Sequence, residues 1–130
     1  MINQYEVPAF IEDTIPELRR ALHQFPAVFH IYETVTCFTD YTSCQLRDNN
    51  YSAVGKCLEL AGKLYERGNS IVKGAITRIF LPALSAFPIK NRVTRITIYS
   101  LIPASLYNLY IQHQLNVGGP LNEYEWNRQI

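Results

Sequence analysis

Three side chains that could support acid–base or nucleophilic chemistry follow one another at intervals of seven residues: His30, Cys37 and Cys44. Tyr41 lies between the two cysteines. Residues at this spacing return to one face of an α-helix, so the four side chains could line a pocket between helices. Successive members of the series are, however, about 10 Å apart along the axis, too far for direct proton transfer within one helix. We therefore favour ordinary packing, and keep a small-ligand-binding protein or a cysteine-dependent enzyme with this pocket as the alternative.

The histidines and cysteines do not have the spacing of metal ligands. His23, His30 and His113 stand far apart, without the His-x-x-x-His or Glu-x-x-His order that places two ligands on one helix face. His30 and Glu33 share a face in the order His-x-x-Glu, which is typical of a solvated pair. The three cysteines are an odd number without Cys-x-x-Cys spacing, which argues against both a zinc site and a disulfide framework. We expect no metal, no cofactor and no catalytic residue.

The composition is that of an ordinary globular domain. Twelve basic and 11 acidic residues give a net charge of +1 in a chain of 130 residues that is 48% hydrophobic. This balance lacks the basic excess of a nucleic-acid-binding protein, and the densest basic run, from Lys90 to Arg95, is short. No apolar stretch approaches the ~20 residues needed to span a bilayer, and the N-terminus does not look like a secretory signal. We expect a cytoplasmic protein that binds neither nucleic acid nor membrane.

Apolar residues recur at helical spacing through most of the chain. The segments with this pattern are Glu12–Leu22, Ala27–Arg47, Ser52–Arg67, Ile71–Phe87 and Pro103–Gln114. In the first segment Thr14 could cap the helix and Pro16 is tolerated in its first turn, whereas Pro82 should kink or end the fourth. Residues 92–100, RVTRITIYS, favour strands by residue type, but no second strand exists for them to pair with. We therefore expect a sixth helix there.

Two predicted helices meet at Gly68-Asn69, in the stretch KLYERGNSIVKGAI. Gly68 suits the left-handed position past a helix end, and Asn69 or Ser70 can cap the next helix. A joint this short makes the flanking helices antiparallel neighbours. Gly62 and Gly74 mark close approaches between helices or are merely tolerated.

These segments predict an all-α protein of five to six helices, packed as antiparallel hairpins in a short bundle or solenoid-like stack. Residues 1–117 form a single all-helical domain, and residues 118–130, which follow Gly-Gly-Pro at its end, form a C-terminal tail. The hairpin around Gly68 resembles a tetratricopeptide or armadillo repeat, although the chain has no 34-residue period. The wider pattern of IPEL, LYERGN followed by VKGAI, FLPAL and LIPASL resembles a family of small, uncharacterised, all-helical bacterial proteins of unknown function. This resemblance implies a compact helical domain and supplies no catalytic residue.

The nine tyrosines are the strongest indication of function. Tyrosine buries a large ring while its hydroxyl stays hydrogen-bonded at the edge, which suits an interaction surface and equally suits a small core. We predict that Tyr99, Tyr107, Tyr110 and the tail residue Trp126 contact another protein or a second copy of the chain. The predicted function is a non-catalytic protein-interaction module of the adaptor or immunity type.

Overall fold

The chain folds into a stack of α-helices in the computed structural model, which describes residues 1–86 and 91–117, with side chains up to 112. The helices are α1 (Val7–Thr14), α2 (Arg19–Leu22), α3 (Ile31–Arg47), α4 (Tyr51–Arg67), α5 (Ser70–Ala75), α6 (Leu81–Ala86), α7 (Arg92–Leu101) and α8 (Ala104–Val117). Two 3₁₀ turns, Pro16–Leu18 and Ala27–Phe29, precede α2 and α3, and a π-helical segment, Ile76–Phe80, joins α5 to α6. The predicted all-α class is confirmed.

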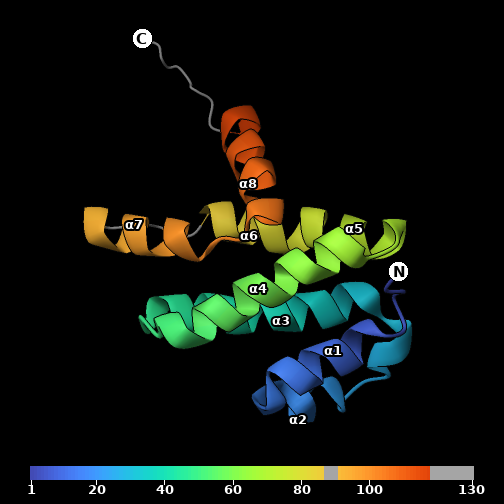
Figure 1. The fold of residues 1–130 in the computed structure, drawn as a ribbon. Helices are drawn as coiled ribbons and strands as arrows, with labels where there is room; N and C mark the ends of the chain where they lie inside the picture. Colours follow the sequence, from blue (N-terminus) through green and yellow to red (C-terminus); the bar gives the residue numbers. More distant parts are fainter. Residues whose placement is uncertain (87–90, 118–130) are drawn as a thin grey trace.

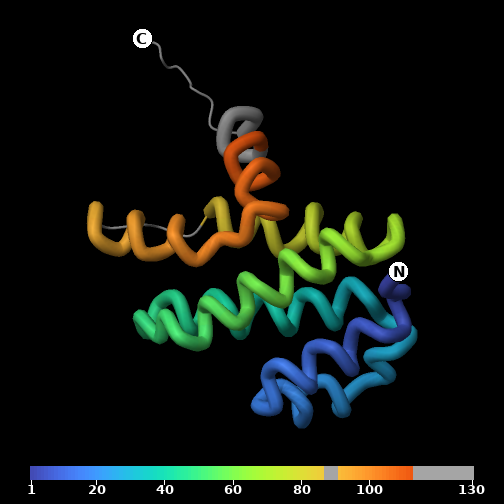
Figure 2. The backbone as a smooth tube through the Cα atoms, in the orientation of Figure 1, coloured from blue at the N-terminus to red at the C-terminus, as the bar shows by residue number. Residues whose placement is uncertain are grey.

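The helices lie in layers, with α3 and α4 side by side and α8 standing across α7 (Figure 1). The α1–α2 segment lies against one side of the long α3–α4 pair, and the continuous rod of α5, the π-helical segment and α6 lies on the other side (Figure 2). The central helix α4 contacts α1, α3, α5, α7 and α8. A stripe of buried side chains from Val54 to Leu64 explains why α4 needs neighbours on several sides.

The N-terminal region is more broken than the sequence pattern predicts. The predicted helix Glu12–Leu22 is wrong, because Thr14 ends α1 rather than capping a helix. Pro16 pushes Ile15 out of the helical region, to φ −131° and ψ 82°, and starts the first 3₁₀ turn. Helix α3 likewise begins only at Ile31, since His30 is not helical, with φ −131° and ψ 75°, and separates the Ala27–Phe29 turn from α3. Of the side chains in that turn, Ala27 is buried, whereas Val28 and Phe29 are exposed.

Helix α3 forms despite many residues that disfavour helices. Its buried threonines satisfy their hydroxyls on backbone carbonyls: Thr39 donates to Val35 O (2.7 Å) and Thr42 to Phe38 O (2.9 Å). The Phe38 ring stacks on Phe80 of the π-helical segment, with centroids 5.2 Å apart. Tertiary packing therefore compensates for the poor propensity of this helix.

The joint between α4 and α5 does not use a left-handed glycine. Gly68 is extended, with φ −72° and ψ 156°. A Cβ at this position would lie 2.3 Å from the Leu64 carbonyl oxygen and 2.6 Å from Val72 Cγ1, so close approach, not a positive φ, requires glycine. Asn69 caps α5 as predicted, since its Oδ1 accepts from Val72 N at 3.0 Å.

The same joint holds the N-terminus. Ile2 N donates to Arg67 O and Asn69 N donates to Ile2 O, both at 2.8 Å, which forms a short parallel bridge at Gly68. The Asn69 amide also donates to Gln4 Oε1 at 2.9 Å. The opening residues thereby tie α1 to the start of α5, a contact that helical periodicity could not reveal.

The segments after the joint follow the prediction more closely. Pro82 is an exception, because it does not end the fourth helix: it is the second residue of α6, which continues to Ala86, and its missing hydrogen-bond donor falls next to the π-helical segment. Residues 92–101 are helical, as predicted, with Asn91 Oδ1 accepting from Thr94 N at 2.8 Å. Gly62 marks a close approach, because a Cβ there would lie 3.0 Å from Pro103 and Ser105 at the start of α8.

Candidate protein-interaction surfaces

Aromatic and aliphatic side chains gather at the surface where the N-terminal segment meets the start of α3. We call this region the aromatic end. It consists of Tyr5, Phe25, Val28, Phe29 and Tyr32. Phe29 is 75% exposed and is the most exposed aromatic side chain among the described residues. It contacts Tyr5 edge to face, with centroids 6.4 Å apart, so the exposed rings lie together and are not scattered.

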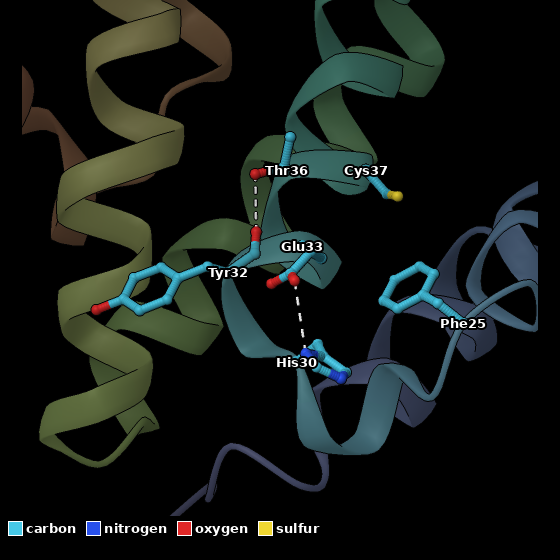
Figure 3. A pocket seen from close by; sticks show the side chains of 6 residues that line it. All are labelled: Phe25, His30, Tyr32, Glu33, Thr36 and Cys37. Atoms are coloured by element: carbon cyan, nitrogen blue, oxygen red, sulfur yellow. Dashed lines mark hydrogen bonds and ion pairs between the residues drawn. The ribbon is translucent and has the colours of Figure 1, made fainter.

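A groove of about 580 Å³ opens beside these residues. It is lined by Phe25, His30, Tyr32, Glu33, Thr36 and Cys37. His30 Nδ1 lies 3.5 Å from Glu33 Oε2, and the Thr36 hydroxyl donates to the Tyr32 carbonyl at 2.7 Å (Figure 3). The Tyr32 ring extends toward the π-helical segment, where its hydroxyl accepts a hydrogen bond from Arg78 at 3.1 Å. The groove thus combines aromatic walls with one exposed carboxylate.

The four residues predicted to share a pocket divide among three places. His30 and Cys37 line the groove at the aromatic end. Tyr41 faces a different, smaller and more polar cleft of about 230 Å³, which Glu17 also lines. Cys44 is exposed, and its sulfur accepts a hydrogen bond from Arg47 Nη2 at 3.1 Å. The predicted convergence is therefore wrong, because a heptad spacing drifts around a straight helix and the neighbouring elements differ along its length.

The environments of Cys37 and Cys57 disfavour thiolates. Burial raises the pKa of the Cys37 thiol, and the nearby Asp40 carboxylate raises it further. Burial also raises the pKa of Cys57, although a hydrogen bond with Thr42 acts in the opposite direction. A nucleophilic cysteine needs the reverse, a lowered pKa beside a cation or helix N-terminus.

Tyr41 and Glu17 form a hydrogen bond across the smaller cleft. The Tyr41 hydroxyl donates to Glu17 Oε2 at 2.8 Å and connects α3 to the first 3₁₀ turn. Burial and this bond to a carboxylate raise the pKa of Tyr41 to about 12. A hydrogen bond from the backbone and the one from Tyr41 lower the pKa of Glu17. This pair fastens α3 to the N-terminal region.

The tyrosines chosen from the sequence have different environments. Tyr110 is only 1% exposed and packs edge to face against Tyr99, with centroids 5.8 Å apart, so it belongs to the core and not to the surface. Tyr99 is half-buried against the core. Tyr107 is 39% exposed and stays available for contact. Trp126 lies outside the described residues.

The comparison with known families places the chain by its sequence. A family model for a domain of unknown function, DUF7674, matches residues 8–116. The chain belongs to that family. No curated protein and no solved structure was found to match it. The DUF7674 domain thus comprises the helical stack from α1 to α8.

A second exposed surface of the DUF7674 domain lies on α7. The α7 face consists of Arg92, Val93, Arg95 and Ile96, all of which are exposed. Val93 is 75% and Ile96 60% exposed, and Ile98 is the only buried residue of this helix. On α7 the sequence analysis chose only Tyr99 as a contact residue and missed Val93 and Ile96, although their spacing beside two arginines was visible.

Charge is segregated along the chain, a signal that the overall balance conceals. Residues 1–66 contain nine acidic and five basic residues, whereas residues 67–122 contain six basic residues and no Asp or Glu. The layers from α1 to α4 therefore carry the carboxylates, and the layers from α5 to α8 carry only cations. Counting the two halves separately would have found this pattern.

Two further properties bear on function. Within the described ranges, no three His, Cys, Asp or Glu side chains gather in an arrangement that could hold a metal ion. Among the helices of those same ranges, none combines the length and apolar character that crossing a membrane requires.

Proposed function

We propose that this DUF7674 domain is a non-catalytic protein-interaction module that docks a partner at the aromatic end. The observation that carries the proposal is the exposure of clustered rings around Phe29, beside a groove wide enough for a side chain of a partner. Exposed apolar clusters with aromatic anchors are typical of protein-binding surfaces. The raised pKa of Cys37 supports binding over nucleophilic chemistry.

The groove also supports a partner of a particular chemistry. Glu33 is exposed at the groove, and Asp40 lies on the same helix two turns further on. An apolar segment that carries Arg or Lys would bury its aliphatic side chains against the rings and pair its cations with these carboxylates. The adaptor or immunity-type role, the cytoplasmic location and the likeness of the α4–α5 hairpin to solenoid repeats belong to the same proposal.

Site-specific photocrosslinking tests the proposal. A photoreactive phenylalanine analogue replaces Phe29 in one variant and the exposed Glu59 of α4 in a matched control. We expect a discrete protein adduct from position 29 and none from position 59. Equal adducts from both positions, or none from either, would contradict docking at the aromatic end.

A small-ligand role is the second candidate, favoured by the volume of the groove. A volume of about 580 Å³ lies in the range of ligand pockets. Modification of Cys37 with a thiol reagent separates the two roles. Slow labelling at neutral pH, unaffected by small metabolites, agrees with a docking surface, whereas fast labelling protected by a metabolite would favour the ligand pocket.

A further inference from the structure

The two exposed apolar surfaces lie at opposite ends of the helix stack. The aromatic end is formed by the segment before α3, on the right in Figure 1, and α7 lies on the left, level with the α5–α6 rod. Each surface holds exposed aliphatic or aromatic side chains that no described helix covers, such as Phe29 at one end and Val93 at the other. A stack with uncovered apolar surfaces at both ends can be extended by another stack.

The carboxylate that lines the groove is opposite in sign to the two cations of the α7 face. Arg92 and Arg95 flank Val93 and Ile96 on α7, and no acidic residue occurs anywhere between Arg67 and Asn122. At the aromatic end, Glu33 lines the groove, and the cation at its rim, Arg78, donates to the Tyr32 hydroxyl. The α7 face thus has the chemistry expected of an occupant of the groove, an apolar segment with two arginines.

We propose that the occupant of the groove is the α7 face of a second copy of this chain, so that copies associate head to tail. This inference rests on the proposed docking role of the aromatic end and names the partner. Val93 and Ile96 of one copy pack against the rings around Phe29 of the next, and Arg92 and Arg95 approach Glu33. The contact is heterologous, so each pair leaves one α7 face and one aromatic end free and the assembly grows.

The alternative, a symmetric dimer, brings like charges together. Pairing two α7 faces places four arginines in one interface without a carboxylate, since Ile98 and its neighbours on α7 supply none. Pairing two aromatic ends opposes two copies of Glu33. Pairing the α7 face of one copy with the aromatic end of another covers apolar side chains on both and brings arginines to a carboxylate. Because the surfaces are small, we expect a dissociation constant on the order of 10–100 µM.

Analytical ultracentrifugation of the full chain tests the inference. We expect the weight-average mass to rise beyond a dimer between about 1 µM and 1 mM, and this rise to weaken as salt increases. The variants Phe29→Asp and Ile96→Asp each change one exposed side chain and should each remain monomeric with an unchanged circular dichroism spectrum.

Mixing the two variants supplies the decisive measurement. F29D keeps an intact α7 face and I96D keeps an intact groove, so the mixture should form a one-to-one dimer that cannot extend. A mixture that stays monomeric while the unaltered chain associates would overturn head-to-tail pairing. The double variant R92E/R95E should also stay monomeric alone, with Lys56→Glu of α4 as the matched control that still associates.

The outcomes distinguish this inference from the proposed function. If the unaltered chain is monomeric at every concentration while position 29 crosslinks a different protein, self-association fails and the docking function stands. If copies associate and F29D does not prevent it, both the head-to-tail pairing and the docking function of the aromatic end are contradicted. Sedimentation with vesicles of phosphatidylcholine and phosphatidylserine completes the test: binding that R92E/R95E abolishes, in a chain that stays monomeric, would assign the α7 face to anionic lipid instead.

Discussion

Helices α4 and α7 have the same kind of apolar spacing and opposite surroundings. In α4 the apolar stripe is buried, because other helices cover it on several sides. In α7, Ile98 alone is buried, while Val93 and Ile96 point to solvent. The difference teaches that burial depends on the position of a helix in the stack. The middle layers determine stability, and the outer layers leave apolar surface free for binding.

The largest expected effect is at the buried Tyr110. Tyr110→Ala should lower the free energy of unfolding by about 3–5 kcal/mol, because it leaves a cavity beside Tyr99 and removes fully buried ring surface. Tyr107→Ala, one turn away and exposed, should change it by less than about 0.5 kcal/mol. Urea unfolding followed by circular dichroism measures both. Equal losses would erase the contrast between core and surface on α8.

A matched pair of glycines tests how tightly the α4–α5 joint is packed. Gly68→Ala should destabilise the fold by about 1–3 kcal/mol, because the added Cβ meets the Leu64 carbonyl and Val72. Gly74→Ala should stabilise it by about 0.5–1 kcal/mol, because its nearest neighbour, Arg78 Nη1, is 3.8 Å from the added Cβ. Thermal unfolding of the two variants would contradict this account if both shifted the midpoint in the same direction.

Exposed Phe29 should behave unlike the buried phenylalanines. Phe29→Ser should leave the free energy of unfolding within about 0.5 kcal/mol of that of the unaltered chain, since the side chain is 75% exposed. Phe38→Ser, in the stacked pair with Phe80, should largely unfold the domain. Chemical denaturation compares the two. A large loss of stability from Phe29→Ser would show that the ring supports the fold and is not reserved for a partner.

The smallest effect concerns the Tyr41–Glu17 hydrogen bond. Tyr41 has a folded-state pKa of about 12, raised from the ordinary value of 10.0, so the stability that its neutral hydroxyl contributes is complete below pH 10 and is lost as pH rises through about 12. Tyr41→Phe lacks this contribution at every pH. The stability difference between the two proteins should therefore shrink from pH 10 to pH 12 in denaturation series. A difference that does not change with pH would show that the hydroxyl bond contributes nothing.

Much of the fold could be predicted from the sequence because its signals are local. The Asn69 cap and the helical state of residues 92–101 follow from hydrogen bonds and periodicity within a few residues. The break at Ile15 was missed, although the residue before Pro16 carried the signal for it. The non-helical His30 was also missed, and with it the turn that exposes Phe29.

The candidate site could be predicted less well. The sequence marked His30 and Cys37, which do share a groove, but it also included Tyr41 and Cys44, which do not. Seven-residue spacing specifies a face of the helix and not the elements that cover it. The groove needs Phe25, which comes from a turn whose position against α3 is set by long-range packing.

The sequence alone determined that the chain is helical, that two helices meet at Gly68 and Asn69, and that tyrosine is abundant enough to need an explanation. Only the tertiary structure decided that Tyr110 is core while Tyr107 and Phe29 are surface, and that acidic and basic layers lie toward opposite ends of the stack. The physical reason is how far apart along the chain the interacting residues lie. Helix formation and capping depend on neighbours within four residues, whereas burial depends on which distant segments lie alongside.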